Sequence, residues 1–177
     1  QNGVASNPNF NKPSAKSDGA PYGISALSSD PATTLERDVT MVLLQHPDIV
    51  PRDRAYAVLQ SRFSHGALAL LRDSMLEQFD SYGKANWVSA VTEAAPEELQ
   101  ALAGQLAVAP LPEKKDQVDR YCRGVTASIL DRELAREKSE LLGTLQRSDS
   151  EKDPSSYKAT QEKLMSIELA RRELREE

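Results

Sequence analysis

The chain has 177 residues, of which 39% are hydrophobic and 28% charged, and its net charge is −5. This length suits one domain, or a small domain with an appendage, and the negative charge argues against a broad basic surface for nucleic acid. The single cysteine excludes an internal disulfide and fits a reducing compartment, and two distant histidines with that cysteine cannot form a standard zinc site. No apolar run is long enough to span a membrane, and no signal-peptide pattern is present. Because the chain begins at Gln1 and not at methionine, we expect it to be a fragment of a longer protein.

The charged residues are unevenly distributed along the chain. Residues 31–112 hold 16 charged side chains in 82 positions, whereas residues 113–177 hold 29 in 65. The middle segment can therefore bury a hydrophobic core, while the last segment must expose most of its surface. Residues 1–30 contain three prolines, three glycines, six serines and four asparagines. Such a segment buries too little surface to offset its ordering entropy, so we predict a linker in which Tyr22 and Ile24 are candidates for local docking.

The middle segment is predicted to begin with three helices. Thr33 and Glu36 have the spacing of a capping box, so the first helix should cover about residues 34–45 and end before Pro47. The second should begin at Pro51, and the third should cover about residues 65–79 with Ser64 as its cap. The residues expected to face the core are Leu35, Val39, Val42 and Leu43 in the first helix, Tyr56, Leu59 and Phe63 in the second, and Leu68, Leu71, Met75 and Phe79 in the third.

Two shorter helices should complete this bundle. A turn at Tyr82 and Gly83 precedes a fourth helix over about residues 84–94, and Pro96 begins a fifth. No segment alternates with the period of a strand between turn residues, so no sheet is predicted and the fold class should be all-α. The inward-facing residues here are expected to be Trp87, Val88, Val91, Leu99, Leu102, Ala103 and Leu106.

No residue pattern in the chain indicates catalysis. There is no phosphate-binding glycine loop, no nucleophile motif and no acidic cluster for a metal. We interpret His46 as a helix-end residue, His65 as a solvated first-turn residue, and Glu97 and Glu98 as acidic residues that suit a helix N-terminus. Cys122 lies on the apolar side of a helix and should be an inert core residue. We therefore predict no catalytic, cofactor-binding or metal-binding residues.

The last third of the chain is predicted to form one very long helix, a short polar break and a second helix. The long helix should run from about residue 112 to 147 and span roughly 50 Å, which is too long for the core of so small a domain. It should pack on the body through Val118, Tyr121, Cys122, Val125 and Ile129, and leave it near Asp131. After the break at residues 148–152, Asp153 and Pro154 have the pattern of a cap and a first helical residue. Coiled-coil spacing of Leu134, Leu141, Leu145, Tyr157, Thr160, Leu164, Ile167, Arg171 and Leu174 predicts a two-helix hairpin.

Three segments resemble the C-terminal, helicase-binding domain of bacterial DNA primases, particularly those of actinobacteria. The first is the helix that ends in LLQHP at residues 43–47. The second is RELAREKSELLGTLQR at residues 132–147, which is similar to the family's arm. The third covers residues 157–172, with a tyrosine, spaced leucines, a glutamate and a basic pair. The resemblance extends over about residues 33–177, and the linker before it fits as well.

The resemblance implies a linker at residues 1–30, a helix bundle at 31–130 and a helicase-binding hairpin at 131–177. It implies docking on the N-terminal domains of the hexameric replicative helicase, which would recruit primer synthesis to the replication fork in the bacterial cytoplasm. The fragment would be non-catalytic, cut from a nucleotidyltransferase, with no cofactor, no membrane contact and little direct binding of nucleic acid. Some members also bind the acidic tail of single-stranded-DNA-binding protein through a basic pocket. The arginines available for that in the body here are Arg37, Arg52, Arg54, Arg62 and Arg72.

The hairpin end and the last helix should face the helicase. The predicted partner-binding residues are Leu145, Gln146, Arg147, Tyr157, Leu164, Glu168, Arg171 and Arg172. The alternative for the apolar residues among them is packing between the two helices, and for the arginines it is a solvated face. For the whole chain, the alternative functions are a self-associating coiled-coil scaffold unrelated to replication, and a small helical enzyme that would need a titratable cluster absent from this sequence.

Overall fold

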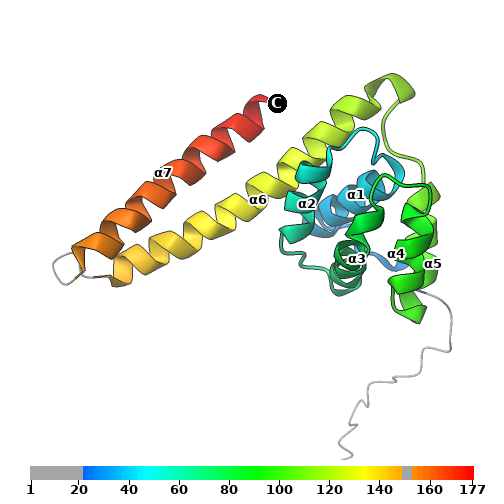
Figure 1. Ribbon diagram of the computed structural model, residues 1–177, viewed down its shortest axis with the longest axis horizontal. Helices are drawn as coiled ribbons and strands as arrows, with labels where there is room; N and C mark the ends of the chain where they lie inside the picture. Colours follow the sequence, from blue (N-terminus) through cyan, green and yellow to red (C-terminus); the bar gives the residue numbers. More distant parts are fainter. Residues whose placement is uncertain (1–21, 149–152) are drawn as a thin grey trace, which may run out of the picture.

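The computed structural model describes residues 22–148 and 153–177, and every regular element within these ranges is a helix. This confirms the predicted all-α class. Helices α1 to α5 and the first part of α6 form a bundle, from which the rest of α6 extends, and α7 returns along it (Figure 1). The helices are α1 (Pro31–Gln45), α2 (Arg52–Gln60), α3 (Gly66–Glu77), α4 (Trp87–Ala94), α5 (Glu97–Val108), α6 (Val118–Arg147) and α7 (Pro154–Glu176), with short 3-10 turns η1 (Ile24–Ala26), η2 (Phe79–Ser81) and η3 (Lys115–Gln117).

Helix α1 is the centre of the bundle, because it contacts α3, α5 and α6. Val39, Val42 and Leu43 are fully buried along it, as their helical spacing predicts. Two buried aromatic side chains tie neighbouring segments to the core with their polar atoms: the Trp87 indole donates to the carbonyl of Leu43 at 2.9 Å, and the Tyr82 hydroxyl donates to that of Val50 at 2.9 Å. Both polar tips therefore have partners although their rings are buried.

The N-terminus of α1 differs from the prediction. Asp30 is the N-cap, and its Oδ1 accepts the backbone N–H of Thr33 at 3.0 Å, so the helix begins at Pro31. This hydrogen bond lowers the pKa of the Asp30 carboxyl. The predicted capping box is wrong because Thr33 and Glu36 already lie inside the helix, on its buried face. The Asp-Pro pair is the stronger start signal, since proline is preorganised for the first helical position.

Predictions for α2, for α3 and for His65 also differ from the structure. Tyr56 is 49% exposed, because Ala55, Val58 and Leu59 form the buried face of α2, and its ring packs on Phe79 instead, with centroids 5.3 Å apart. Phe63 lies after the end of α2 and is half-buried. The third helix is shorter than predicted at both ends. His65 is its N-cap in place of Ser64, which makes no side-chain cap bond, and Phe79 belongs to η2. His65 is half-buried and not solvated, with its Nε2 at 3.4 Å from the hydroxyl of Tyr22.

The buried faces of the remaining bundle helices follow the sequence pattern, although α4 begins three residues later than predicted and Pro96 is the N-cap of α5 and not its first residue. Trp87 and Val91 of α4 are buried, as are Leu99, Leu102, Ala103 and Leu106 of α5. The turn at Tyr82 and Gly83 is confirmed, and Gly83 has a φ of 79°, a conformation that glycine adopts without steric cost. Tyr22 and Ile24 dock as the sequence suggested, since both pack against the core and the Ile24 N–H donates to Gln105 Oε1 at 2.8 Å. The rest of the predicted linker, residues 1–21, lies outside the described residues.

Helix α6 has 30 residues, which corresponds to about 45 Å. It begins six residues later than predicted, after the 3-10 turn η3. Its C-terminus at Arg147 agrees with the prediction. Cys122 and Ile129 are buried, and Ile129 is the last fully buried residue of this helix, so α6 leaves the core close to Asp131 as expected. Asp153 caps α7 as predicted, through a 3.0 Å bond from the N–H of Ser156, whereas break residues 149–152 lie outside the described residues.

Candidate partner-binding hairpin

The hairpin, meaning residues 131–177, is held by one side of each of its two helices. Ile167 is the only buried residue of α7. Its predicted seam neighbours on α7 are all partly covered, whereas the residues between them are largely exposed. This alternation confirms the coiled-coil spacing that the sequence predicted. The half-buried members of the seam are Leu134, Leu141 and Leu145 on α6, and Tyr157, Thr160, Leu164, Arg171 and Leu174 on α7.

Ion pairs connect the two helices beside this seam. Lys138 lies 2.6 Å from Glu168 and Lys163 lies 2.6 Å from Glu137, while Asp131 lies 2.8 Å from Arg171 and 3.5 Å from Arg175. The hydrogen bond from Arg171 is the main cause of a lowered pKa for Asp131, and the bond from Lys138 has the same effect on Glu168. These partly exposed pairs add to the packing of the seam residues, and each contributes only modestly to the stability of the hairpin in this register.

The end of α7 is also joined to the bundle. Arg54 of α2 donates from Nε to the hydroxyl of Thr126 on α6 at 2.8 Å, and its Nη2 lies 2.7 Å from the carboxylate of Glu177. One arginine thus links the bundle, the long helix and the end of the chain. The hairpin is therefore attached to the bundle at the C-terminal end of α7, while the C-terminal part of α6 and the N-terminal part of α7 extend away from the bundle (Figure 1).

The eight predicted partner-binding residues fall into three groups. Leu145, Tyr157 and Leu164 are half-buried along the seam, which is the alternative that the sequence left open. Glu168 and Arg171 form ion pairs across the seam. The remaining residues, Gln146, Arg147 and Arg172, are exposed, and Arg172 pairs with Glu176 one turn later at 3.1 Å.

The sequence reasoning missed two apolar residues on the outer face of α7. Met165 is 74% exposed and Leu169 is 60% exposed. They are four residues apart, and Arg172 follows three residues later, so the three side chains share one face of the helix. We call Met165, Leu169 and Arg172 the outer stripe. The signal was present in the sequence, since these apolar residues lie off the seam spacing and have no intramolecular reason to be apolar.

Nothing in the described part of the chain suggests chemistry at this surface. Residues 22–148 and 153–177 contain no group of three or more histidine, cysteine or acidic side chains that could hold a metal ion. Cys122 is fully buried, and burial raises the pKa of its thiol to about 11. None of the helices that the structure describes is long and apolar enough to cross a lipid bilayer.

Comparison with known proteins identifies the domain. The sequence profile of the family described as DNA primase DnaG DnaB-binding matches residues 36–160. The chain belongs to this family. Its fold is similar to the solved structure of the helicase binding domain of primase from Mycobacterium tuberculosis, with a TM-score of 0.69 and 23% identity over 81% of this chain and 91% of that one. No curated protein sequence matches the chain.

A helicase-binding primase domain is an interaction domain without catalytic activity of its own, in agreement with the absence of catalytic motifs noted above. The five arginines of the bundle that the sequence offered for a basic pocket are all paired. Each of these arginines lies within ion-pair distance of a carboxylate. The pairs are Arg37 with Asp38, Arg52 with Asp80, Arg54 with Glu177, Arg62 with Glu133, and Arg72 with Asp73.

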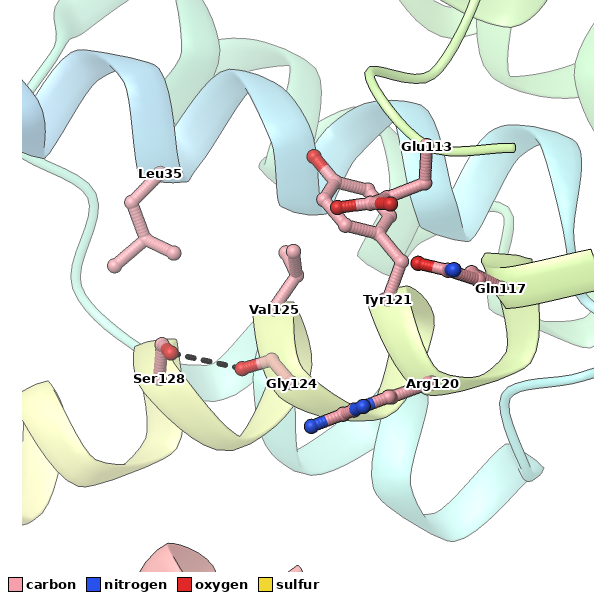
Figure 2. A pocket seen from close by; sticks show the side chains of 8 residues that line it. All are labelled: Leu35, Glu113, Gln117, Arg120, Tyr121, Gly124, Val125 and Ser128. Atoms are coloured by element: carbon pink, nitrogen blue, oxygen red, sulfur yellow. Dashed lines mark hydrogen bonds between the residues drawn. The ribbon is translucent and has the colours of Figure 1, made fainter.

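The bundle of this primase domain has a pocket of about 390 Å³ between α1 and α6. Figure 2 shows Leu35 pointing from α1 toward the part of α6 that carries Val125 and Ser128, while Tyr121 lies at the other end of the pocket beside Glu113 and Gln117. Gly124 has no side chain to fill the space. Burial, reinforced by the charge of Asp38, raises the pKa of the Tyr121 hydroxyl, so this group stays neutral. The pocket is amphipathic, and Arg120 is its only arginine or lysine.

Proposed function

We propose that this domain binds the hexameric replicative helicase DnaB through its hairpin, and thereby recruits primer synthesis to the replication fork in the cytoplasm. The observation that carries the proposal is the outer stripe. This chain belongs to a DnaB-binding family, and it presents exposed apolar side chains on a pair of helices that extends away from the bundle (Figure 1). An exposed Met165 and Leu169 contribute nothing to the hairpin's own core, so a partner that covers them would gain hydrophobic free energy.

The outer stripe has the composition of a protein-binding surface. Met165 and Leu169 share their helix face with Arg172. Arginine beside apolar anchor residues is typical of interface hot spots with a charged rim. Gln146 and Arg147, at the C-terminal end of α6, are further exposed polar residues of the hairpin. Leu145, Tyr157 and Leu164 are proposed to act indirectly, by holding the two helices together, and Glu168 and Arg171 through their ion pairs across the seam.

The helicase N-terminal domains are the proposed partner surface, as the resemblance to primases implied. The similar structure from Mycobacterium tuberculosis is itself described as a helicase binding domain. The test is a binding titration of the chain against the isolated N-terminal domain of the cognate helicase. Deletion of residues 131–177 is expected to abolish binding. If the bundle alone binds as tightly as the whole chain, the hairpin is not the interface.

A self-associating scaffold is the competing interpretation, because the same exposed side chains could pair two copies of this chain. Sedimentation equilibrium separates the two. A monomer that binds helicase supports the proposal, whereas a tight dimer with no helicase affinity refutes it. The outer stripe contains only two large apolar side chains, far less than the area that obligate dimers bury.

For the acidic tail of single-stranded-DNA-binding protein, we propose the pocket of Figure 2 as the site. The five arginines considered from the sequence are already paired with carboxylates, whereas Arg120 lines a pocket with apolar walls formed by Leu35 and Val125. Such a pocket suits an acidic peptide with an apolar end. In a fluorescence titration with that peptide, Arg120→Ala should weaken binding and Arg72→Ala should not; equal effects would refute this site.

A further inference from the structure

The loop between α2 and α3, residues 61–65, lies against the part of α6 that has just left the core. The Arg62 backbone N–H donates to Glu133 at 3.0 Å, its Nε donates to the same carboxylate at 2.7 Å, and its Nη1 donates to Glu140. In return, the Arg62 carbonyl accepts from Arg132 at 2.9 Å and from Arg136 at 3.0 Å. One loop residue therefore contacts α6 over two helical turns beyond Ile129.

A buried carboxylate holds this loop in place. The Glu36 side chain is fully buried, and its two oxygens accept the backbone N–H groups of Ser64 at 2.6 Å and His65 at 2.9 Å. The same carboxylate accepts from Arg132 at 2.8 Å. Arg132 has two further side-chain nitrogens, Nε and Nη1, that are buried and make no hydrogen bond within the described residues. Glu36 and the Arg62 carbonyl are thus the partners that hold Arg132, and α1, the loop and α6 meet at one charge pair.

These contacts lie where α6 leaves the bundle, so a small rotation there produces a large displacement at the far end of the helix. Arg147 lies fifteen residues beyond Arg132 on a continuous helix, or about 22 Å. A rotation of about 10° at Arg132 would therefore move the free end of the helix by about 4 Å, estimated from the helical rise. No side chain of α6 beyond Ile129 is fully buried. The direction of the hairpin relative to the bundle therefore depends on these polar contacts and on the Arg54–Glu177 pair at the C-terminal end of α7.

We propose that Glu36, Arg62, Arg132, Glu133, Arg136 and Glu140 form an arm clamp that sets the direction of the hairpin and preorganises it for its partner. The clamp residues are positioning residues, since they lie at the base of the hairpin and not on its outer stripe. This inference rests on the proposed helicase binding for its functional consequence. If the hairpin samples many directions, only a fraction of the molecules has the direction that binds the partner. The apparent affinity is then reduced in proportion to that fraction.

The hairpin direction is measured by pulsed electron resonance between nitroxide labels at Val108→Cys and Ser155→Cys, with Cys122→Ala throughout. Both labelled residues are exposed. Glu36→Gln replaces one accepting oxygen by an NH₂ group, which cannot accept the hydrogen bonds that the carboxylate receives. It also removes the negative charge opposite Arg132. Arg62→Ala is the second variant, because its side chain is 47% exposed and its loss leaves the core intact. Arg123→Ala is the matched control, since it removes an exposed pair with Asp119 within one helix.

Both clamp variants should broaden the distance distribution and weaken helicase binding about tenfold at unchanged helicity, and the control should match the wild type. Distributions as narrow as that of the wild type in both variants would refute the clamp. A broadened distribution with unchanged affinity would refute its role in binding. If the wild-type chain does not bind helicase at all, the proposed function fails, and the distance measurement still decides whether the clamp sets the direction.

Discussion

Replacing Met165 and Leu169 by alanine tests the outer stripe most directly. Both side chains are largely exposed, so the double variant should fold like the wild type, and alanine preserves the helix propensity of α7. What the variant removes is apolar surface that a partner would cover. Loss of helicase affinity without loss of stability is therefore the expected signature of an interface.

The size of the effect follows from the exposed fractions. Burying a whole leucine or methionine side chain contributes about 1.5–3 kcal/mol. Since 74% of Met165 and 60% of Leu169 are available for burial, each should contribute about 1–2 kcal/mol to binding. Replacing both would then weaken the Kd roughly 30- to 700-fold, at about 1.4 kcal/mol per tenfold change.

The assay is calorimetric titration into the helicase N-terminal domain, with a thermal melt of each variant alongside. Val108→Ala is the matched control: Val108 is 80% exposed at the end of α5, and α5 lies on the side of the bundle away from the hairpin (Figure 1). The control should bind like the wild type. A double variant that binds within twofold of the wild type, at equal stability, would show that the helicase does not cover this face.

Three other perturbations address the seam, the ion pairs and the buried thiol. Ile167→Ala removes the one buried side chain of α7 and should destabilise the hairpin by about 2 kcal/mol, seen as faster amide exchange in α7 with the bundle unchanged. The lowered pKa of Asp131 means that its carboxylate stabilises the fold above its unfolded pKa of about 4 and that this contribution is lost as the pH falls below it. Asp131→Asn should therefore flatten the loss of stability between pH 6 and pH 3 in acid titrations followed by circular dichroism. Cys122, buried with a raised pKa, should react with a thiol reagent at pH 7 only at the rate of unfolding.

Each of these has a control within the same chain. Met165→Ala alone, on the exposed face of α7, should leave amide exchange near the wild-type rates, and equal exchange in the Ile167 variant would contradict the seam. Asp119→Asn removes an exposed pair within α6 and should leave the acid titration unchanged. Identical acid profiles for the wild type and the Asp131 variant would contradict a contribution from the Arg171 pair. Rapid stoichiometric labelling of the native chain would contradict the burial of Cys122.

Local pattern was sufficient for much of this structure. The spacing of Tyr157, Leu164 and Ile167 correctly indicated which side of α7 packs on α6. The Asp153-Pro154 pair correctly marked its start. These features depend on residues within one or two helical turns of each other, so the sequence contains the whole physical cause.

The errors arose where a residue's environment is built by distant segments. Glu36 has capping-box spacing, yet its carboxylate is taken by a loop 28 residues later and by Arg132, 96 residues later. Tyr56 is aromatic and was expected inside, but smaller neighbours fill the core side of α2 and Phe79 offers its ring a surface site. Periodicity assigns a face to a helix but does not state which segment will cover it.

The sequence by itself determined that this protein is an all-α bundle with a long, highly charged hairpin, because composition and helical period are local properties. The tertiary structure decided which of the charged residues pair, which apolar residues remain uncovered, and how the hairpin is joined to the bundle. Alternating acidic and basic residues on two helices allow many pairings, and only the packed register selects Lys138 with Glu168 and Arg171 with Asp131. The exposure of Met165 and Leu169 follows from that same register, since it places them on the face that α6 does not cover.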